Sequence, residues 1–159
     1  MPVVLLPSSE TVCVTYIQTI PGISVDVVAT QLPADNTQWA TYGAILVSVV
    51  GGIPDMDIPV AHPIVQLDFL ANNPGSPRPP WWKANALAEQ VRMALYDKAR
   101  VGRIVTPVAG GQQYPAAKVL SAYLLGEPRR IYGDAGTYAR FQCDMALSWC
   151  PVAPIPTDT

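Results

Sequence analysis

The clearest pattern of apolar and polar positions lies just past the middle of the chain, where apolar residues recur every three or four positions, the spacing of an amphipathic helix that buries one face. These positions are Ala84, Leu87, Ala88, Val91, Ala94 and Leu95. Pro79 and Pro80 stand before or within the first turn, where a missing backbone N–H has no intrahelical partner. Lys98 and Arg100 suit the negative pole of the helix dipole. We expect a helix from Trp82 to Arg100, about 28 Å long at about 1.5 Å per residue.

A shorter helix is expected near the N-terminus. Ser8 or Ser9 can accept a hydrogen bond from the free N–H groups of a first turn and so begin a helix that runs to Ile20. Val12 and Tyr16 lie on one side of this helix, although residues 12, 14 and 16 also fit the alternation of a strand. We favour the helix.

Five segments show the alternation or the short apolar run of β-strands, and they cover residues 23–27, 44–50, 63–71, 117–125 and 138–149. The order of elements is then αβββαββ. It predicts an α+β fold with a mostly antiparallel sheet of about four to five strands, on which the long helix and the shorter N-terminal helix pack. A length of 159 residues fits one domain, residues 1–159. The proline-rich ends, 1–7 and 151–159, are expected to be extended or flexible.

The chain carries few charges, and their distribution is uneven. Charged residues make up 14% of the sequence, against about 25% in an average soluble protein, which favours a surface covered by partners over a loop-rich monomer. All ten Lys and Arg lie from Arg78 onward, whereas residues 1–77 hold six acidic residues and no basic one. In a ring, this separation can give each subunit two complementary surfaces. The alternative is that the two halves interleave and the charges mix.

The residue types that catalysis and metal binding need are sparse. His62 is the only histidine, so we interpret it as a lone histidine at the surface or a sheet edge. Asp55 and Asp57 are too few donors for a calcium loop and indicate a solvated acidic loop. The three cysteines, expected to be reduced packing residues, are Cys13, Cys143 and Cys150. We therefore expect no enzyme, no cofactor and no metal. The longest apolar run, 44–50, is too short to cross a bilayer, so we expect no membrane partner.

Aromatic and basic residues gather at the start of the long helix and before the last strand. Adjacent tryptophans on a helix point about 100° apart, so one is expected to pack in the core and the other to contact a neighbour. Trp and Arg often anchor protein interfaces. We expect a subunit or partner interface formed by Arg78, Trp81, Trp82, Arg129 and Arg130. Stacking of a nucleotide or sugar on the tryptophans, and phosphate binding by the arginine pair, are the alternatives.

Three stretches, in this order, are PIVQLDFLANN, KANALAEQVRMAL and PRRIYGDAGTYARFQCDMALSW. Together with the order of elements they resemble the tail terminator, or tail completion, family of long-tailed bacteriophages, particularly of actinobacterial siphophages. The resemblance covers residues 9–152 and includes a last strand opened by the step Tyr138-Ala139-Arg140. It implies a structural virion protein whose copies, six by family likeness, form a ring that caps the tail tube, ends tail polymerisation and offers a surface for joining the head.

The resemblance also implies partners and a location. The partners are other copies of the chain, the major tail tube protein and a head-side connector or head-closure protein, with DNA only passing through the lumen. The location is the neck of the virion, after assembly in the host cytoplasm. Another neck component, such as a head-closure protein, is the nearest alternative. A small-molecule-binding or hydrolytic domain with a pocket near Trp81 is the alternative from a different class.

Overall fold

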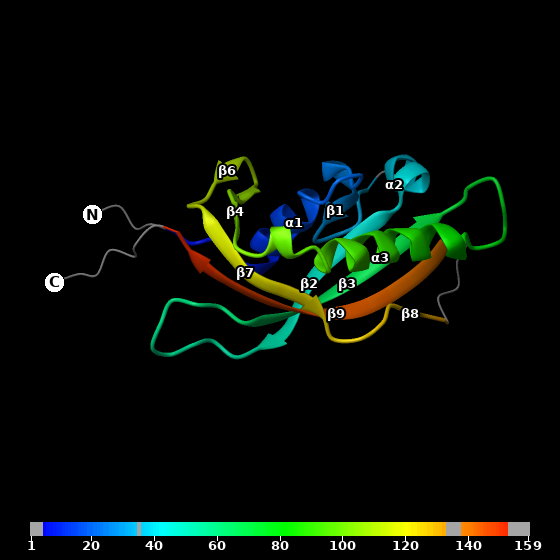
Figure 1. Cartoon of the computed structure of the whole chain (residues 1–159). Helices are drawn as coiled ribbons and strands as arrows, with labels where there is room; N and C mark the ends of the chain where they lie inside the picture. Colours follow the sequence, from blue (N-terminus) through cyan, green and yellow to red (C-terminus); the bar gives the residue numbers. More distant parts are fainter. Residues whose placement is uncertain (1–4, 35, 133–137, 153–159) are drawn as a thin grey trace.

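The computed structural model describes residues 5–34, 36–132 and 138–152, with the backbone alone for 36–38. Within these ranges the chain forms a curled, mostly antiparallel sheet with helices on one face, so the α+β class expected from the sequence is confirmed (Figure 1). The helices are α1 (Ser9–Gln18), α2 (Asn36–Tyr42) and α3 (Trp81–Leu95), with 3₁₀ turns at Val25–Val27 and Lys98–Arg100. The strands are β1 (Val28–Ala29), β2 (Ala44–Gly52), β3 (Pro63–Asn72), β4 (Arg103–Val105), β5 (Val108–Ala109), β6 (Gln112–Gln113), β7 (Ala117–Leu124), β8 (Arg129–Arg130) and β9 (Tyr138–Pro151).

The long strand β9 lies at the centre of the main sheet, whose order in the described chain is β1-β2-β3-β9-β7-β4. One side of β9 pairs with β3 from Ala146 to Tyr138, and Phe141 lies opposite Phe69. The other side pairs first with β8 and then with β7, so these two strands share one edge of β9. The pairing of β1 with β2 is parallel, and β5 with β6 forms a separate hairpin.

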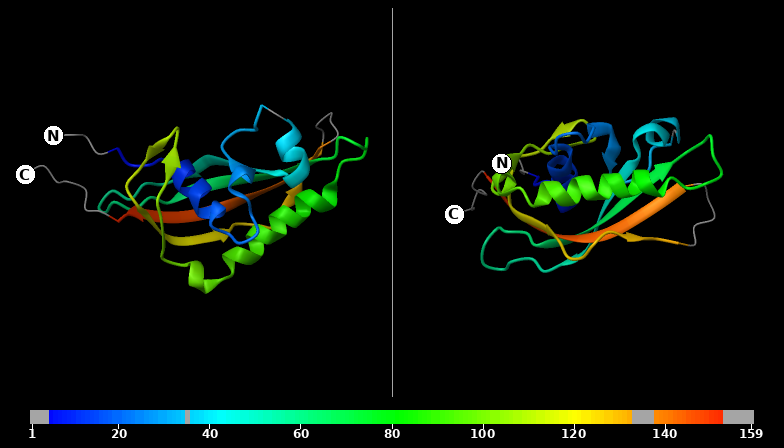
Figure 2. Two further views of the ribbon diagram at one scale, coloured as in Figure 1. Left: turned by 90° about the horizontal axis from the view of Figure 1, so that it is seen from above. Right: turned by 45° about the vertical axis from the view of Figure 1, so that its right-hand side comes forward.

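Alternate residues of the central strands point toward the helices and form the core. Leu67 and Phe69 of β3 and Met145 of β9 are fully buried. Helix α3 contributes Ala84 and Ala88, also fully buried, and these small side chains let the helix lie close to the sheet. Figure 2 shows α1 and α3 side by side above the same sheet face. The apolar stripe of α3 predicted from the sequence therefore packs as expected.

The four long strands match four of the expected segments to within a few residues. These are β2, β3, β7 and β9. The expected helix starts are also confirmed. The Ser8 hydroxyl accepts a hydrogen bond from the N–H of Thr11 at 3.1 Å, and Pro80 is the N-cap residue directly before α3. Helix α1 ends at Gln18, two residues before the expected end.

The prediction of a strand at residues 23–27 is wrong. The Val27 N–H donates to the Ser24 carbonyl at 3.1 Å in a 3₁₀ turn, and only Val28–Ala29 joins the sheet. The segment between residues 27 and 44, where the sequence predicts no helix or strand, holds α2. The short strands β4, β5, β6 and β8 were not predicted either. The main sheet therefore contains seven strands in the described residues, against the four to five expected.

The expected terminal arms are only partly described. Leu5 and Leu6 are exposed and lie outside any helix or strand, whereas Pro7 is buried. Pro151, expected to begin the C-terminal arm, is instead the last residue of β9 and pairs with Ala117. Residues 1–4 and 153–159 lie outside the described residues.

The long helix ends earlier than its apolar pattern predicts. Its last residue is Leu95 rather than Arg100. The Asp97 carboxylate accepts a hydrogen bond from the Ala99 N–H at 3.0 Å and so begins a separate 3₁₀ turn. An aspartate that bonds nearby backbone N–H groups competes with the continuing helix in this way.

Arg100 was expected to interact with the end of the long helix α3, but it contacts the end of α1 instead. Its side chain is 5% exposed, and its guanidinium donates to the Thr19 hydroxyl at 2.7 Å and to the Tyr16 and Thr19 carbonyls at 3.4 Å. Its Cζ atom lies 5.1 Å from the centroid of the Tyr16 ring. These carbonyls lie at the end of α1, where the negative pole of the helix dipole attracts a cation. Arg100 thus connects the end of the α3 region to α1.

Replacing Arg100 with alanine removes these hydrogen bonds and the contact with the Tyr16 ring, and it leaves the space of a buried side chain empty. We expect Arg100→Ala to lower the free energy of unfolding by about 2–4 kcal/mol, measured by urea denaturation. Arg103→Ala is the control, because Arg103 is exposed, and it should change stability by less than about 0.5 kcal/mol. Equal effects of the two substitutions would contradict the role given to Arg100.

Candidate functional site

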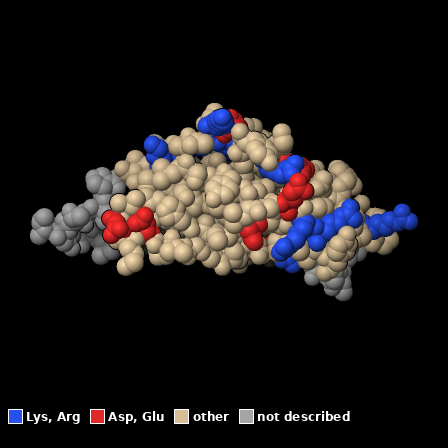
Figure 3. All heavy atoms as spheres, turned by 60° about the horizontal axis from the view of Figure 1, so that its bottom comes forward, with Lys and Arg blue, Asp and Glu red and all other residues tan. Residues whose placement is uncertain are grey.

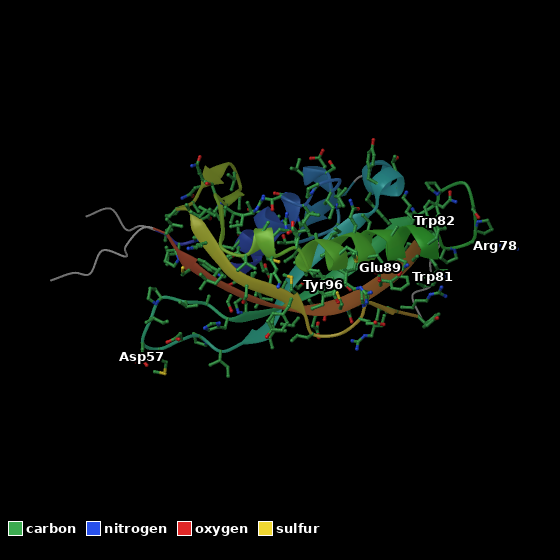
Figure 4. The ribbon with its side chains drawn as sticks, in the orientation of Figure 1. Asp57, Arg78, Trp81, Trp82, Glu89 and Tyr96 are labelled. Carbon is green, nitrogen blue, oxygen red and sulfur yellow. The ribbon has the colours of Figure 1, made fainter. Side chains whose placement is uncertain are left out.

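The two adjacent tryptophans at the start of α3 have different environments, as expected. Trp81 packs against the core, with its ring centroid 5.7 Å from that of Tyr132 and 6.1 Å from that of Phe141. Trp82 is 75% exposed and lies at the outer end of α3 (Figure 4). Such an exposed tryptophan is a typical anchor for a partner.

Strand β8 brings Arg130 onto Trp81, although the two residues are far apart in sequence. Arg130 pairs with Phe141 in the sheet, and so its side chain points to the helix side. Its Cζ atom lies 5.0 Å from the Trp81 ring centroid and 5.9 Å from that of Phe141. A guanidinium over an aromatic face is attracted by the ring quadrupole, by about 0.5–2 kcal/mol. This stacking holds the exposed Arg130 in place.

Arg129 points to the opposite face of the sheet, where a buried carboxylate organises polar side chains. It donates to the Gln142 Oε1 atom at 3.1 Å, and the Gln142 Nε2 atom donates to Asp68 Oδ1 at 3.0 Å. Asp68 is 6% exposed and also accepts from Arg140 Nε at 2.9 Å and Gln66 Nε2 at 3.3 Å. The network ties β8, β9 and β3 together beneath the candidate interface.

Arg78 lies at the same end of the molecule, in the loop between β3 and α3 (Figure 4). It is exposed, and its backbone N–H donates to the Ser76 hydroxyl at 3.2 Å. The structure therefore brings Trp81, Arg130 and Tyr132 into contact, whereas Arg78 and Trp82 share only their location. We call Arg78, Trp81, Trp82, Arg129, Arg130 and Tyr132 the aromatic-basic end.

The loop between β2 and β3 forms a second exposed feature, at the other end of the molecule (Figures 1 and 4). We call residues 53–60 the hairpin loop. Asp55 accepts hydrogen bonds through Oδ1 from the N–H groups of Asp57 at 2.9 Å and Ile58 at 3.2 Å, which lowers the pKa of Asp55. Both aspartates are exposed, so the predicted solvated acidic loop is confirmed. The base of the loop requires glycine at Gly52, whose φ is +121° and where a Cβ would lie 2.4 Å from the His62 carbonyl oxygen.

The hairpin loop also exposes apolar side chains, which sequence reasoning did not single out. Ile53 is 81% exposed, Met56 96% and Ile58 54%. The signal in the sequence was the alternation of apolar and acidic residues between two prolines, but alternation alone does not distinguish a strand from a protruding loop. His62, at the base of the loop, is exposed as expected and lies 2.8 Å, through Nδ1, from the Ser148 hydroxyl oxygen.

On the face shown in Figure 3, a group of acidic side chains lies at one end and a large basic group at the other. Further acidic side chains lie near the basic group, and further basic ones lie along the upper part of the view. The acidic group lies on the side where Figure 4 labels Asp57, and the basic group on the side where it labels Arg78. Much of the surface between them is uncharged. On this face the charges are not uniformly mixed.

Two hollows in the described surface lie away from the tryptophans. One, of about 250 Å³, lies between the end of α3 and β7, where Arg92 pairs with Glu89 at 3.1 Å and Glu127 at 3.2 Å. Another, of about 420 Å³, lies between α1 and the segment 29–34. Trp81 lines neither of these two hollows, although the alternative of a small-molecule-binding domain places its pocket near Trp81. Among the residues that the structure describes, no three His, Cys, Asp or Glu side chains group as metal ligands.

The three cysteines are free thiols, as expected. Burial raises the pKa of Cys13 strongly, and it raises the pKa of Cys143 to about 12. Neither thiol is therefore a ready nucleophile at neutral pH. Cys150 is half-buried near the end of β9.

The role of the Asp68 hydrogen bonds in fixing β8 can be tested by substitution. Asp68→Ala removes the carboxylate that accepts hydrogen bonds from Arg140, Gln142 and Gln66, and it leaves the buried Gln142 amide without this acceptor. We therefore expect a loss of about 3 kcal/mol in the free energy of unfolding. We also expect faster amide hydrogen exchange at Ile131, whose N–H donates to the Arg140 carbonyl at 2.9 Å. Asp26→Ala, at an exposed site, is the control. If exchange at Ile131 responds equally to both substitutions, the network does not hold β8.

Comparison with known proteins leaves the family of the chain open. No family model matches the sequence, and no curated protein matches it either. None of the helices within the described ranges is long and apolar enough to cross a membrane. The resemblance to tail terminator proteins therefore stays a prediction, as does the interface expected at the aromatic-basic end.

Proposed function

We propose that the protein is a structural component of a phage tail, a tail terminator whose copies form a ring. By family resemblance the ring has six subunits, caps the tail tube, stops its polymerisation and presents a joining surface to the head-side connector. The observation that supports the proposal best is the aromatic-basic end, which combines Trp82, 75% exposed, with Arg130 held on the Trp81 ring and Arg129 held by Gln142.

A closed ring with an open lumen makes a specific physical demand on its subunit. Each copy must offer one surface to the neighbour on its left and a different surface to the neighbour on its right, because the contact is repeated by rotation. An exposed tryptophan and ordered arginines suit one of these surfaces, since such side chains dominate the energetics of interfaces. The low share of charged residues, 14%, suits a subunit with large covered surfaces.

The remaining parts of the proposal follow from the family resemblance. The partners are the major tail tube protein on one side of the ring and the head-side connector on the other, with DNA passing through the lumen. The place of action is the neck of the virion, after assembly in the host cytoplasm. The protein acts by fitting partners together, without catalysis or a cofactor.

The ring itself can be tested with purified protein. We expect a mass near six times the 17.1 kDa subunit, by mass photometry, alone or after addition of tail tubes. Trp82→Ala removes the exposed indole, and Arg130→Glu reverses the charge of the side chain stacked on Trp81. The double variant should therefore shift the population toward the single subunit. Tyr42→Ala with Lys118→Glu is the matched control, because both residues are exposed elsewhere. A wild-type chain that stays single under all these conditions contradicts the ring, and an unchanged mass of the double variant removes these residues from the contact.

The place of the ring in the particle can be tested by electron microscopy of phage assembled without the protein. A terminator predicts tails that are longer than normal and not joined to heads, because nothing stops the tube from growing. Tails of normal length that fail to join heads would indicate a head-closure role instead. Complete, infectious particles would contradict both functions.

A further inference from the structure

The hairpin loop projects from the sheet and is held in one conformation by its own hydrogen bonds and prolines, unlike a flexible connecting loop. Two backbone N–H groups bind the Asp55 carboxylate, and Pro54 and Pro59 restrict the backbone on either side. A loop that is ordered before binding loses less conformational entropy when it binds. Its exposed apolar side chains, Ile53 and Met56 above all, are therefore displayed at little further cost.

The acidic charge of the loop remains available to a partner. The Asp57 side chain makes no hydrogen bond or ion pair that the described residues reveal, and Asp55 uses only its Oδ1 atom. No lysine or arginine lies before Arg78 in the sequence, so the loop and its two strands supply none to Asp57. Besides the two backbone hydrogen bonds, His62 at the base of the loop interacts electrostatically with Asp55 and contributes to its lowered pKa. A partner surface for the loop should combine apolar or aromatic contact area with positive charge.

The aromatic-basic end of the same chain has these properties. Trp82 is 75% exposed and Tyr132 73%. Arg78 and Arg130 are exposed at the same end of the molecule, and Arg129 is exposed there on the opposite face of the sheet. The Arg130 guanidinium is held on the Trp81 ring and Arg129 on Gln142, so the positive charges occupy fixed positions. Fixed charges and rigid aromatic rings lose little freedom on binding.

The loop and the aromatic-basic end of one chain cannot meet each other. Strand β3 begins at Pro63, just after the hairpin loop, and ends at Asn72, before the loop that holds Arg78. Its 10 residues separate the two features by about 33 Å at about 3.3 Å per residue. Figure 4 shows Asp57 and Arg78 at opposite ends of the molecule. The two surfaces can pair only between copies.

We infer that the hairpin loop of one copy binds the aromatic-basic end of the next copy, in a head-to-tail contact that closes into the ring. The inference rests on the proposed function and identifies the two surfaces that the ring needs. The apolar tip, Ile53 and Met56, lies on the exposed rings of Trp82 and Tyr132, while Asp57 faces the arginines. A second copy of the chain is the partner that fits the aromatic-basic end. Its hairpin loop supplies apolar side chains for the exposed aromatic rings and acidic charge for the arginines.

The charge part of the contact is tested by a paired reversal. Asp57→Arg and Arg130→Asp, each alone, should weaken ring formation about tenfold, read by mass photometry as a higher concentration for half assembly. An equimolar mixture of the two variants should recover assembly, because each reversed loop can then meet a reversed end. Asp57→Arg leaves Asp55 and its hydrogen bonds in place, so the loop keeps its shape. Two weakened variants that do not rescue each other would overturn the pairing.

The apolar part is tested with a methionine pair. Met56→Ser should weaken assembly about tenfold, whereas Met93→Ser, which removes a methionine that is 62% exposed on α3, should leave it unchanged. If the wild-type chain forms rings and both Met56→Ser and Asp57→Arg assemble as well as the wild type does, the inferred contact is wrong, although the proposed ring is not contradicted. If Met56→Ser forms normal rings but no longer binds tail tubes, the loop contacts the tube protein and the inference is overturned. A wild-type chain that forms no ring removes the contact and the proposed function together.

Discussion

The pairing of β3 with β9 is the contact on which the other features depend. Its register places Phe69 opposite Phe141 on the helix side and Asp68 opposite Gln142 on the other side. One face of the sheet can therefore bury α1 and α3, while the other holds a polar network around a nearly buried carboxylate. A shift by one residue would exchange these faces and leave Asp68 in the apolar core.

The same strand pair also separates and orients the two exposed ends. The hairpin loop precedes β3, and the loop with Arg78 follows it, so the length of a strand lies between them. Strand β9 then carries β8 to the Arg78 end, where Arg130 stacks on Trp81 and Arg129 reaches Gln142. The curled sheet is thus a rigid spacer between an acidic, apolar projection and a basic, aromatic surface.

The sequence predicted those elements whose signal is local. The long strands show an alternation or a short apolar run, and α3 has a proline-marked start and an apolar stripe, so they were expected close to their observed places. The end of α3 was misplaced because one side-chain hydrogen bond, from Ala99 to Asp97, interrupts an otherwise continuous pattern. The two-residue strands β1 and β8 depend on the neighbouring strands and carry no pattern of their own. The split between Trp81 and Trp82 followed from helix geometry, whereas the stacking of Arg130 and the burial of Asp68 follow from strand register.

The central claim is that identical copies join end to end around a lumen at the phage neck. A reconstruction of the neck by electron cryomicroscopy tests it most directly. The account predicts a ring of this subunit at the head-side end of the tail tube, with Met56 of each copy against Trp82 of the next. A neck that lacks this chain, or a ring in which residues 53–60 face the lumen or the tube, would contradict it.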